Sequence, residues 1–245
     1  MPLLACPAVR SRRKPGNQRS SPSAREIYRP ARVTYSVKEI YYTLQGEGAQ
    51  TGRPAVFCRF AGCNLWSGRE EGRSTAICQF CDTQFVGTDG PGGGTFESPR
   101  SLAEAVISHW PTHSHSAATP FVVCTGGEPL LQLDEPLVAA FHNCGLEVAI
   151  ETNGTRTPPP GIDWVCASPK AGADFVLESG DELKLVYPQP GAEPERYLHL
   201  DYTHFFLQPM DGRQRQENTT AAARYCLEHP RWRLSLQTHK FIGIP

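Results

Sequence analysis

The sequence lacks any long hydrophobic run. No stretch of about eighteen apolar residues, the length that a membrane-spanning helix needs, occurs in its 245 residues. Hydrophobic residues make up 39% and charged residues 20% of the chain, the balance of an ordinary globular protein. Membrane insertion is therefore not expected, and a chain of this length is expected to build one domain around a sizeable core.

The nine cysteines lack the even, recurring spacing of a secreted disulfide framework. This absence favours a reducing, cytoplasmic location. Five cysteines stand singly in apolar stretches, where an unpaired cysteine usually acts as a small core residue; they are Cys58, Cys124, Cys144, Cys166 and Cys226. Cysteine chemistry is therefore expected in the clustered cysteines instead.

The chain also lacks a broad basic surface. Its formal net charge is -1, but residues 1–32 carry eight basic side chains and one acid, so that segment is +7 and the remainder is -8. An acidic folded part is not expected to bind nucleic acid. A small molecule or another protein is the more suitable partner.

Residues 1–32 differ in composition from the rest of the chain. They are rich in Arg, Ser and Pro and have no sustained apolar period, so they cannot bury enough surface to offset chain entropy. We expect a disordered basic extension there. Its prolines disfavour the amphipathic helix of a transit peptide, and we interpret the extension as the product of a start codon upstream of the true one. The folded domain is expected to span residues 33–245.

The remainder alternates between strand and helix patterns. Helices are predicted over residues 101–110, over 130–145 with an interruption at Pro136, and over 216–229 before Pro230. Strands are predicted at about residues 37–43, 55–60, 120–124, 146–154, 163–168, 182–187, 203–209 and 232–238. Short apolar strands followed by polar loops predict an α/β fold with a mostly parallel sheet, and a ligand site at the carboxyl ends of the strands.

Residues 87–95, GTDGPGGGT, form a glycine-rich segment. It lacks the lysine of a phosphate-binding loop and the helix start that follows one. We interpret it as a flexible connection.

Three cysteines stand in an uneven pattern, with fourteen residues between Cys63 and Cys78 and two between Cys78 and Cys81. A structural zinc site closes with four ligands, and the spare histidines follow only after a glycine loop and a predicted helix: His109, His113 and His115. Three thiolates can instead hold a cluster of four irons whose fourth iron is left open for a ligand. An open iron is a catalytic feature.

This pattern resembles the radical S-adenosylmethionine (SAM) superfamily, with a long insert between the first two cysteines. Phe80 stands where that superfamily packs an aromatic ring beside the SAM adenine, and TGGEP at residues 125–129 resembles its glycine-rich segment that meets the SAM amino group. ETNGT follows at the end of a later predicted strand.

Further segments in register narrow the resemblance to the 7-carboxy-7-deazaguanine synthase family, over about residues 33–245. They are YTLQGEG (42–48), RFAGCNLW (59–66), the fourteen-residue gap, CDT (81–83), TGGEP, ETNG, SPK (168–170), LQPMD (207–211) and QTHKFIGIP (237–245). SPK or QPMD alone would be read as a turn, but the common order strengthens each piece. The resemblance implies an incomplete, mostly parallel (βα) barrel of the radical SAM type with few helices.

The resemblance implies two cofactors. Cys63, Cys78 and Cys81 would bind a 4Fe-4S cluster, and SAM would occupy the fourth iron, where one electron splits it into methionine and a 5'-deoxyadenosyl radical. The side chains and backbone groups expected to contact SAM are those of Phe80, Cys81, Asp82, Gly127, Ser168, Pro169, Lys170, Gln208, Pro209, Met210 and Asp211.

The resemblance also implies a substrate, 6-carboxy-5,6,7,8-tetrahydropterin. The family is a lyase that converts this pterin to 7-carboxy-7-deazaguanine and ammonia by hydrogen abstraction and ring contraction, on the route to queuosine in tRNA. No side chain carries over as a catalytic acid or base. The expected substrate contacts are Leu44, Gln45, Gly46, Arg59, Thr125, His239 and Pro245, with Arg59 suited to bidentate binding of a planar anion and the end of the chain docked rather than frayed.

A magnesium ion is expected at Thr83 only when substrate is present, because magnesium commonly bridges to a substrate oxygen and keeps several waters. The resemblance implies an external, flavodoxin-like electron donor and a homodimer. Two alternatives stay open at this point: a radical SAM activase that installs a glycyl radical on another protein, and a zinc-binding module without enzymatic activity.

Overall fold

The computed structural model describes residues 34–111 and 118–245. The expected disordered extension, like His113 and His115, lies outside these ranges. The described residues form one nine-stranded sheet in the order β3-β1-β2-β4-β5-β6-β7-β8-β9. The strands are β1 (Tyr35–Leu44), β2 (Pro54–Phe60), β3 (Gly94–Phe96), β4 (Phe121–Gly126), β5 (Glu147–Thr152), β6 (Trp164–Ala167), β7 (Ser179–Tyr187), β8 (Asp201–Pro209) and β9 (Trp232–Leu234).

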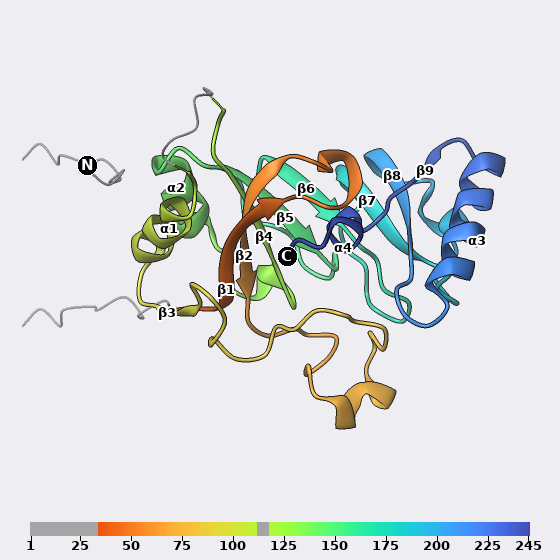
Figure 1. Ribbon diagram of the computed structural model, residues 1–245, viewed down its shortest axis with the longest axis horizontal. Coiled ribbons are helices and arrows are strands. Elements are labelled where there is room, and N and C mark those ends of the chain that lie inside the picture. The colour runs from red at the N-terminus through yellow and green to blue at the C-terminus, as the bar shows by residue number, and fades with distance from the viewer. Residues whose placement is uncertain (1–33, 112–117) are drawn as a thin grey trace, which may run out of the picture.

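The sheet is mostly parallel. In the part of the sheet ordered β2-β4-β5-β6-β7-β8-β9, each strand runs parallel to its neighbours. Only β1 runs antiparallel to its neighbours, β2 and β3. The sheet curves but does not close, since β3 and β9 are its two ends (Figure 1). The predicted incomplete parallel barrel with few helices is confirmed.

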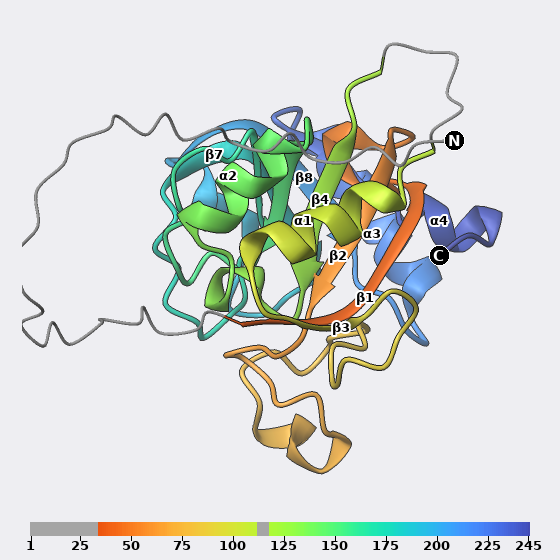
Figure 2. The same cartoon turned by 90° about the vertical axis from the view of Figure 1, so that its left-hand side faces the viewer.

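Three helices cover the outer face of the sheet. The helices α1 (Pro99–Ser108) and α2 (Glu135–Asn143) lie next to each other against the first strands (Figure 2), and α3 (Arg215–Glu228) packs on β8 and β9. Side chains on each strand alternate between the two faces. Ile150, Leu185 and Leu207 are fully buried in the two hydrophobic cores under the helices, so their neighbours on the same strands face the inside of the barrel. No helix of residues 34–111 and 118–245 is long and apolar enough to cross a membrane.

The helix expected to be interrupted by Pro136 instead begins there. A short 3-10 helix, Pro129–Leu131, comes first, and α2 starts after Asp134, whose carboxylate accepts the Leu137 N–H at 3.0 Å. Proline suits the first turn of a helix, where its missing N–H is not needed. The predicted interruption is present, but it lies at residues 132–134, just before Pro136, and α2 follows it. β3 and the short C-terminal helix α4 (Thr238–Ile242) were not predicted.

The glycine-rich segment is packed against β1, contrary to the expected flexible connection. The Gly90 N–H donates to the Lys38 carbonyl at 2.9 Å, and the Pro91 carbonyl accepts from Ile40 at 2.8 Å. A Cβ at Gly93 would lie 2.2 Å from the Lys38 carbonyl oxygen. Glycine is used here for close approach to the strand.

Four of the five singly placed cysteines are core residues, as predicted. Cys58, Cys124 and Cys166 are buried, and Cys226 is partly buried and packed against the second hydrophobic core. Cys144 packs against the first core but is disulfide-bonded, so the expectation of an unpaired cysteine is wrong there.

A buried carboxylate joins β4 to β5 at their carboxyl ends. Glu128, fully buried, accepts hydrogen bonds from the Asn153 N–H at 2.8 Å, the Thr152 hydroxyl at 2.8 Å and the Leu130 N–H at 3.0 Å. Burial raises the pKa of Glu128. A buried carboxylate is tolerated only when it is hydrogen-bonded, and the donors of Thr152 and Asn153 hold the TGGEP and ETNG segments together.

Glu128→Ala is expected to lower the free energy of unfolding by about 3 kcal/mol, because it leaves three buried donors without an acceptor. Urea denaturation followed by circular dichroism measures the change. Glu71→Ala, at an exposed position of the cysteine insert, should change the stability by less than about 0.5 kcal/mol. Equal losses in the two variants would contradict this account of Glu128.

Candidate functional site

A cavity of about 640 Å³ lies inside the barrel at the carboxyl ends of the strands. Its size falls in the range of small-molecule sites. The loops after β1, β2, β4, β5, β6 and β8 reach it, as does the C-terminal segment. It lies where a parallel α/β sheet is expected to bind its ligand.

The three clustered cysteines all line this cavity. Burial raises the pKa of Cys63, and a hydrogen bond to Cys81, together with burial, raises that of Cys78. The same hydrogen bond, donated by the Cys78 thiol, lowers the pKa of Cys81 to about 6 although burial opposes it. Cys81 is therefore the sulfur most readily available as a thiolate, the form that binds iron.

The insert between Cys63 and Cys78 is tied back to the cysteine loop by Arg73. The Arg73 guanidinium donates to the backbone carbonyls of Gln79 at 2.9 Å and Cys81 at 3.0 Å. It also lies 4.0 Å from the centroid of the Trp66 ring and pairs with Glu70. Although the insert projects away from the sheet in Figure 1, one of its side chains thus holds the backbone around Cys81.

Two glycines let β4 approach the cysteine loop. Gly126 has a φ of +136°, and a Cβ there would lie 2.2 Å from the Phe60 carbonyl oxygen. At Gly127 a Cβ would lie 2.1 Å from the Gly62 carbonyl oxygen and 2.7 Å from the Cys63 Cβ. Any side chain here would displace Cys63, so the glycines set the position of the first cysteine.

Most of the residues expected to contact SAM reach the cavity. Those in its lining are Phe80, Cys81, Asp82, Gly127, Ser168, Lys170, Gln208, Pro209 and Asp211; Pro169 and Met210 are not. Pro169 is buried, and the Met210 backbone is engaged with Tyr187 and Asn218. The Lys170 ammonium donates to the Ser168 carbonyl at 2.6 Å and to its hydroxyl at 2.7 Å.

All the residues expected to contact the substrate line the same cavity: Leu44, Gln45, Gly46, Arg59, Thr125, His239 and Pro245. Thr83, expected at a magnesium ion, lines it too. The Arg59 guanidinium is already oriented, since its Nε donates to Glu39 at 2.7 Å and one terminal nitrogen donates to the Tyr41 hydroxyl at 2.7 Å. No sequence motif indicates these two partners, because they come from the neighbouring antiparallel strand.

The C-terminal segment lines the cavity and joins its walls, and Figure 1 shows this segment in front of the sheet. The Thr238 N–H donates to the Gly46 carbonyl at 2.9 Å, and the Thr43 hydroxyl donates to a Pro245 oxygen at 2.9 Å. Between them, Lys240 bridges Asp82 at 2.6 Å and Asp211 at 2.7 Å. The segment therefore links the loop after β1 to the cysteine loop and to the end of β8.

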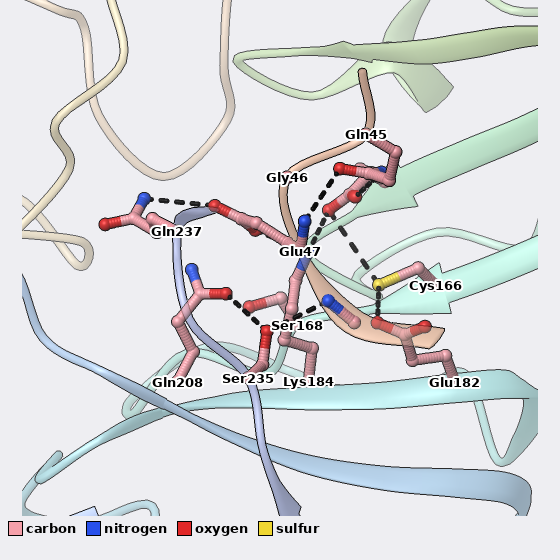
Figure 3. Close-up of polar contacts among 12 residues, drawn as sticks. Gln45, Gly46, Glu47, Cys166, Ser168, Glu182, Lys184, Gln208, Ser235 and Gln237 are labelled. Atoms are coloured by element: carbon pink, nitrogen blue, oxygen red, sulfur yellow. Dashed lines mark hydrogen bonds and ion pairs between the residues drawn. The ribbon is translucent and has the colours of Figure 1, made fainter. Parts of the chain in front are cut away.

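Sequence reasoning missed three charged residues of the cavity. Lys184 on β7 pairs with Glu47 and with Glu151, each at 2.6 Å, and all three line the cavity. Figure 3 shows Glu47 and Lys184 with Cys166 and Glu182 on one side and Gln237 on the other. A lysine in the apolar strand ELKLVY was the available signal, because a buried ammonium needs an acidic partner.

The cysteine triad fits a cluster better than a single ion. Within the described part of the chain, no three His, Cys, Asp or Glu side chains converge as the ligands of one metal ion. Each thiolate of a 4Fe-4S cluster binds a different iron, so the three sulfurs need only face one shared space, as they do. The same finding leaves Thr83 without a cage of protein ligands for magnesium.

Arg73→Met is expected to weaken the hold of the three cysteines on an iron cluster. Loss of groups that orient metal ligands typically costs tenfold or more in affinity, so release of iron to a chelator should be about tenfold faster than in the unchanged protein. The exposed Arg69 of the same insert offers the matched control, and Arg69→Met should release iron at the original rate. Equal rates in all three proteins would rule out this role for Arg73.

Comparison with known proteins agrees with this geometry. No family model matches the chain. The 7-carboxy-7-deazaguanine synthase of Bordetella pertussis is 64% identical over 213 residues, 87% of this chain and all of the relative, and that of Caulobacter vibrioides is 59% identical over the same shares. The crystal structure of QueE from Escherichia coli superposes with a TM-score of 0.59 at 27% identity, covering 84% of this chain and 95% of that one. The chain belongs to the 7-carboxy-7-deazaguanine synthase family.

Proposed function

We propose that this chain is a radical SAM lyase that converts 6-carboxy-5,6,7,8-tetrahydropterin to 7-carboxy-7-deazaguanine and ammonia, on the route to queuosine. The observation that carries the proposal is the single cavity, which collects the three cysteines and every residue expected to contact the pterin. Membership of the family supports the same activity.

The cysteine side of the cavity would hold a 4Fe-4S cluster through Cys63, Cys78 and Cys81, with SAM beside it. When bound, these groups supply a carbon radical that takes a hydrogen atom from the pterin. The protein's own part is to hold both partners in register and to keep water away. Phe80, Gly127 and the Ser168–Lys170 segment line the space next to the thiols, where SAM would lie.

The opposite side of the cavity would bind the pterin. Arg59 is held by Glu39 and Tyr41 through its Nε and one terminal nitrogen, which leaves N–H groups of the guanidinium for the substrate carboxylate. Thr125 offers a hydroxyl, and the Gln45–Gly46 backbone is held in place by Thr238. A guanidinium fixed before binding loses little entropy when the carboxylate arrives.

The magnesium ion belongs to this proposal as well. Thr83 offers one oxygen at the cavity, and the remaining ligands would be a substrate oxygen and water, as magnesium prefers. We further propose a homodimer, an external flavodoxin-like electron donor and a reducing, cytoplasmic setting. Reduced thiols are needed for the cluster.

The proposed reaction is tested by anaerobic incubation of the reconstituted protein with SAM, a reductant, magnesium and the carboxytetrahydropterin. Mass-resolved chromatography should detect 5'-deoxyadenosine and 7-carboxy-7-deazaguanine, and neither should form with Cys81→Ala. Deoxyadenosine without the deazapurine would reject the pterin as substrate. A radical SAM activase would give this result. Neither product from brown, cluster-loaded protein would reject the radical chemistry.

Adding residues after Pro245 should impair turnover while leaving the cluster in place. The Pro245 oxygen is engaged by Thr43 at 2.9 Å in the cavity wall, and an extension would disturb this contact. Loss of one such contact corresponds to about tenfold in kcat/KM for the pterin. The same tag placed at the N-terminus is the control, and equal activity of both tagged proteins would refute the prediction.

A further inference from the structure

A buried ammonium group lies between two carboxylates in the wall of the cavity. Lys184 is 3% exposed, and its Nζ lies 2.6 Å from Glu47 Oε2 and 2.6 Å from Glu151 Oε2. Glu47 comes from the loop after β1 and Glu151 from the end of β5. The lysine therefore connects two segments that are far apart in the chain and that face the same ligand space.

The second oxygen of each carboxylate is also engaged. Gln237 donates to Glu47 Oε1 at 3.0 Å, and Gln45 donates to Glu151 Oε1 at 2.9 Å. A carboxylate accepts about four hydrogen bonds. Each group is thus fixed in direction by two partners and still has acceptor capacity; Figure 3 shows Glu47 between Lys184 and Gln237.

The charges of this group are unequal. Burial raises the pKa of Glu47, but attraction to Lys184 and the hydrogen bonds it accepts outweigh burial and bring the pKa down to about 2. Burial raises the pKa of Glu182, which accepts from the Cys166 thiol at 3.5 Å and from the Ala49 N–H at 2.8 Å. Lys184 thus supplies one ammonium between the two carboxylates of Glu47 and Glu151.

Stability alone gives no reason for this arrangement. Burying an ammonium and two carboxylates costs desolvation energy, and replacing buried ion pairs by apolar side chains is often neutral or stabilising. The other face of the same strand shows what packing alone selects, since Leu183 and Leu185 are both fully buried. A lysine that faces a ligand cavity points to a role in binding instead.

We propose that Lys184 is a positioning residue that keeps the carboxylates of Glu47 and Glu151 aimed into the cavity, where they accept hydrogen bonds from a ring rich in N–H donors. The proposal rests on the proposed function for the identity of that ring, a reduced pterin. Lys184 acts through the two carboxylates and transfers no proton itself. Without its ammonium, two buried carboxylates would face each other, and one of them would hold a proton at neutral pH.

Lys184→Met is the informative variant, because methionine fills the space of the alkyl chain without the charge. At pH 6 we expect kcat/KM for the pterin to fall about 100-fold, the scale of a misplaced binding group. The loss should recover toward about pH 9, as the buried carboxylates ionise, whereas the unchanged enzyme should show no such recovery. The dissociation constant of SAM, measured without pterin, should not change.

The sign of this pH dependence follows from the surroundings. Lys184 holds the pKa of Glu47 low, so removing it raises that pKa and moves deprotonation to higher pH. The other titratable groups near the pair are Glu182, Cys166, His239, Tyr41 and Lys170. Burial raises the pKa of Glu182, Cys166 and Tyr41 and lowers that of His239 and Lys170.

Two further variants separate positioning from a structural role. Arg53→Met removes a comparable ion pair, with Glu147, outside the cavity, and should leave both kcat/KM and its pH profile unchanged. Glu47→Gln combined with Lys184→Met should lower kcat/KM no more than the worse of the two single variants does, because both residues act through one group. If Lys184→Met alone does not fold, the double variant provides the test, because it also removes the negative charge of Glu47. Its activity should still rise with pH, through Glu151.

The outcomes are distinct. A loss that is the same at every pH, a parallel loss of SAM affinity, or additive effects of the two substitutions would overturn the proposal for Lys184. Absence of the deazapurine product from the unchanged enzyme would instead overturn the proposed function, and it would be seen before any variant is compared.

Discussion

The alternation of side chains along parallel strands is the constraint on which this structure depends. On β5, β7 and β8 the residues facing the helices are apolar and fully buried, while Glu151, Lys184 and Gln208 face inward. Because the sheet does not close, these inward polar groups cannot be covered by a complete ring of strands. They are covered by loops and by the C-terminal segment, so the inside of the barrel remains a place where polar groups meet a ligand.

Close backbone approach brings the separate loops into one site. The glycines of TGGEP let β4 touch the backbone around Cys63, and Glu128 in the same segment holds the end of β5 by two hydrogen bonds. Arg73 fixes the backbone of Cys81 from the other side. The cysteines are thus positioned by neighbours from three different parts of the chain, and none of these contacts involves the sulfur atoms themselves.

Much of the fold was predictable because it depends on local patterns. Apolar runs ended by Gly, Asn or Pro marked β2, β4, β5, β7 and β8, and the order of short motifs predicted which loops meet at the carboxyl ends. The misses have local causes too. Pro136 was taken as a break because proline disrupts a helix interior, whereas Asp134 makes it part of the first turn. The five-residue α4 depends on contacts with Gly46, Asp82 and Asp211. No local sequence pattern predicts these contacts.

The candidate site was predictable where a motif names the residue and unpredictable where a partner comes from a distant strand. Arg59 was found, but not Glu39 and Tyr41, which orient it across the antiparallel pair. Glu47 lies within a recognised motif, yet its importance depends on Lys184, which the linear sequence presents as one lysine in an apolar strand. Pairing between strands is set by register, and register is a property of the folded sheet.

Lys170 and Lys184, two of the lysines that line the cavity, show how one physical effect gives opposite results. Burial disfavours the charged form of both. At Lys170, whose ammonium donates to the neutral Ser168, burial prevails and the pKa falls. At Lys184, Glu47 and Glu151 reverse the effect and the pKa rises. The thiols of Cys78 and Cys81 favour the charged form of Lys170 when they ionise, so an anionic group bound by those thiols would raise the pKa of that lysine. The cavity therefore has one end whose positive charge is already compensated by the protein and another whose charge depends on what the cysteines bind.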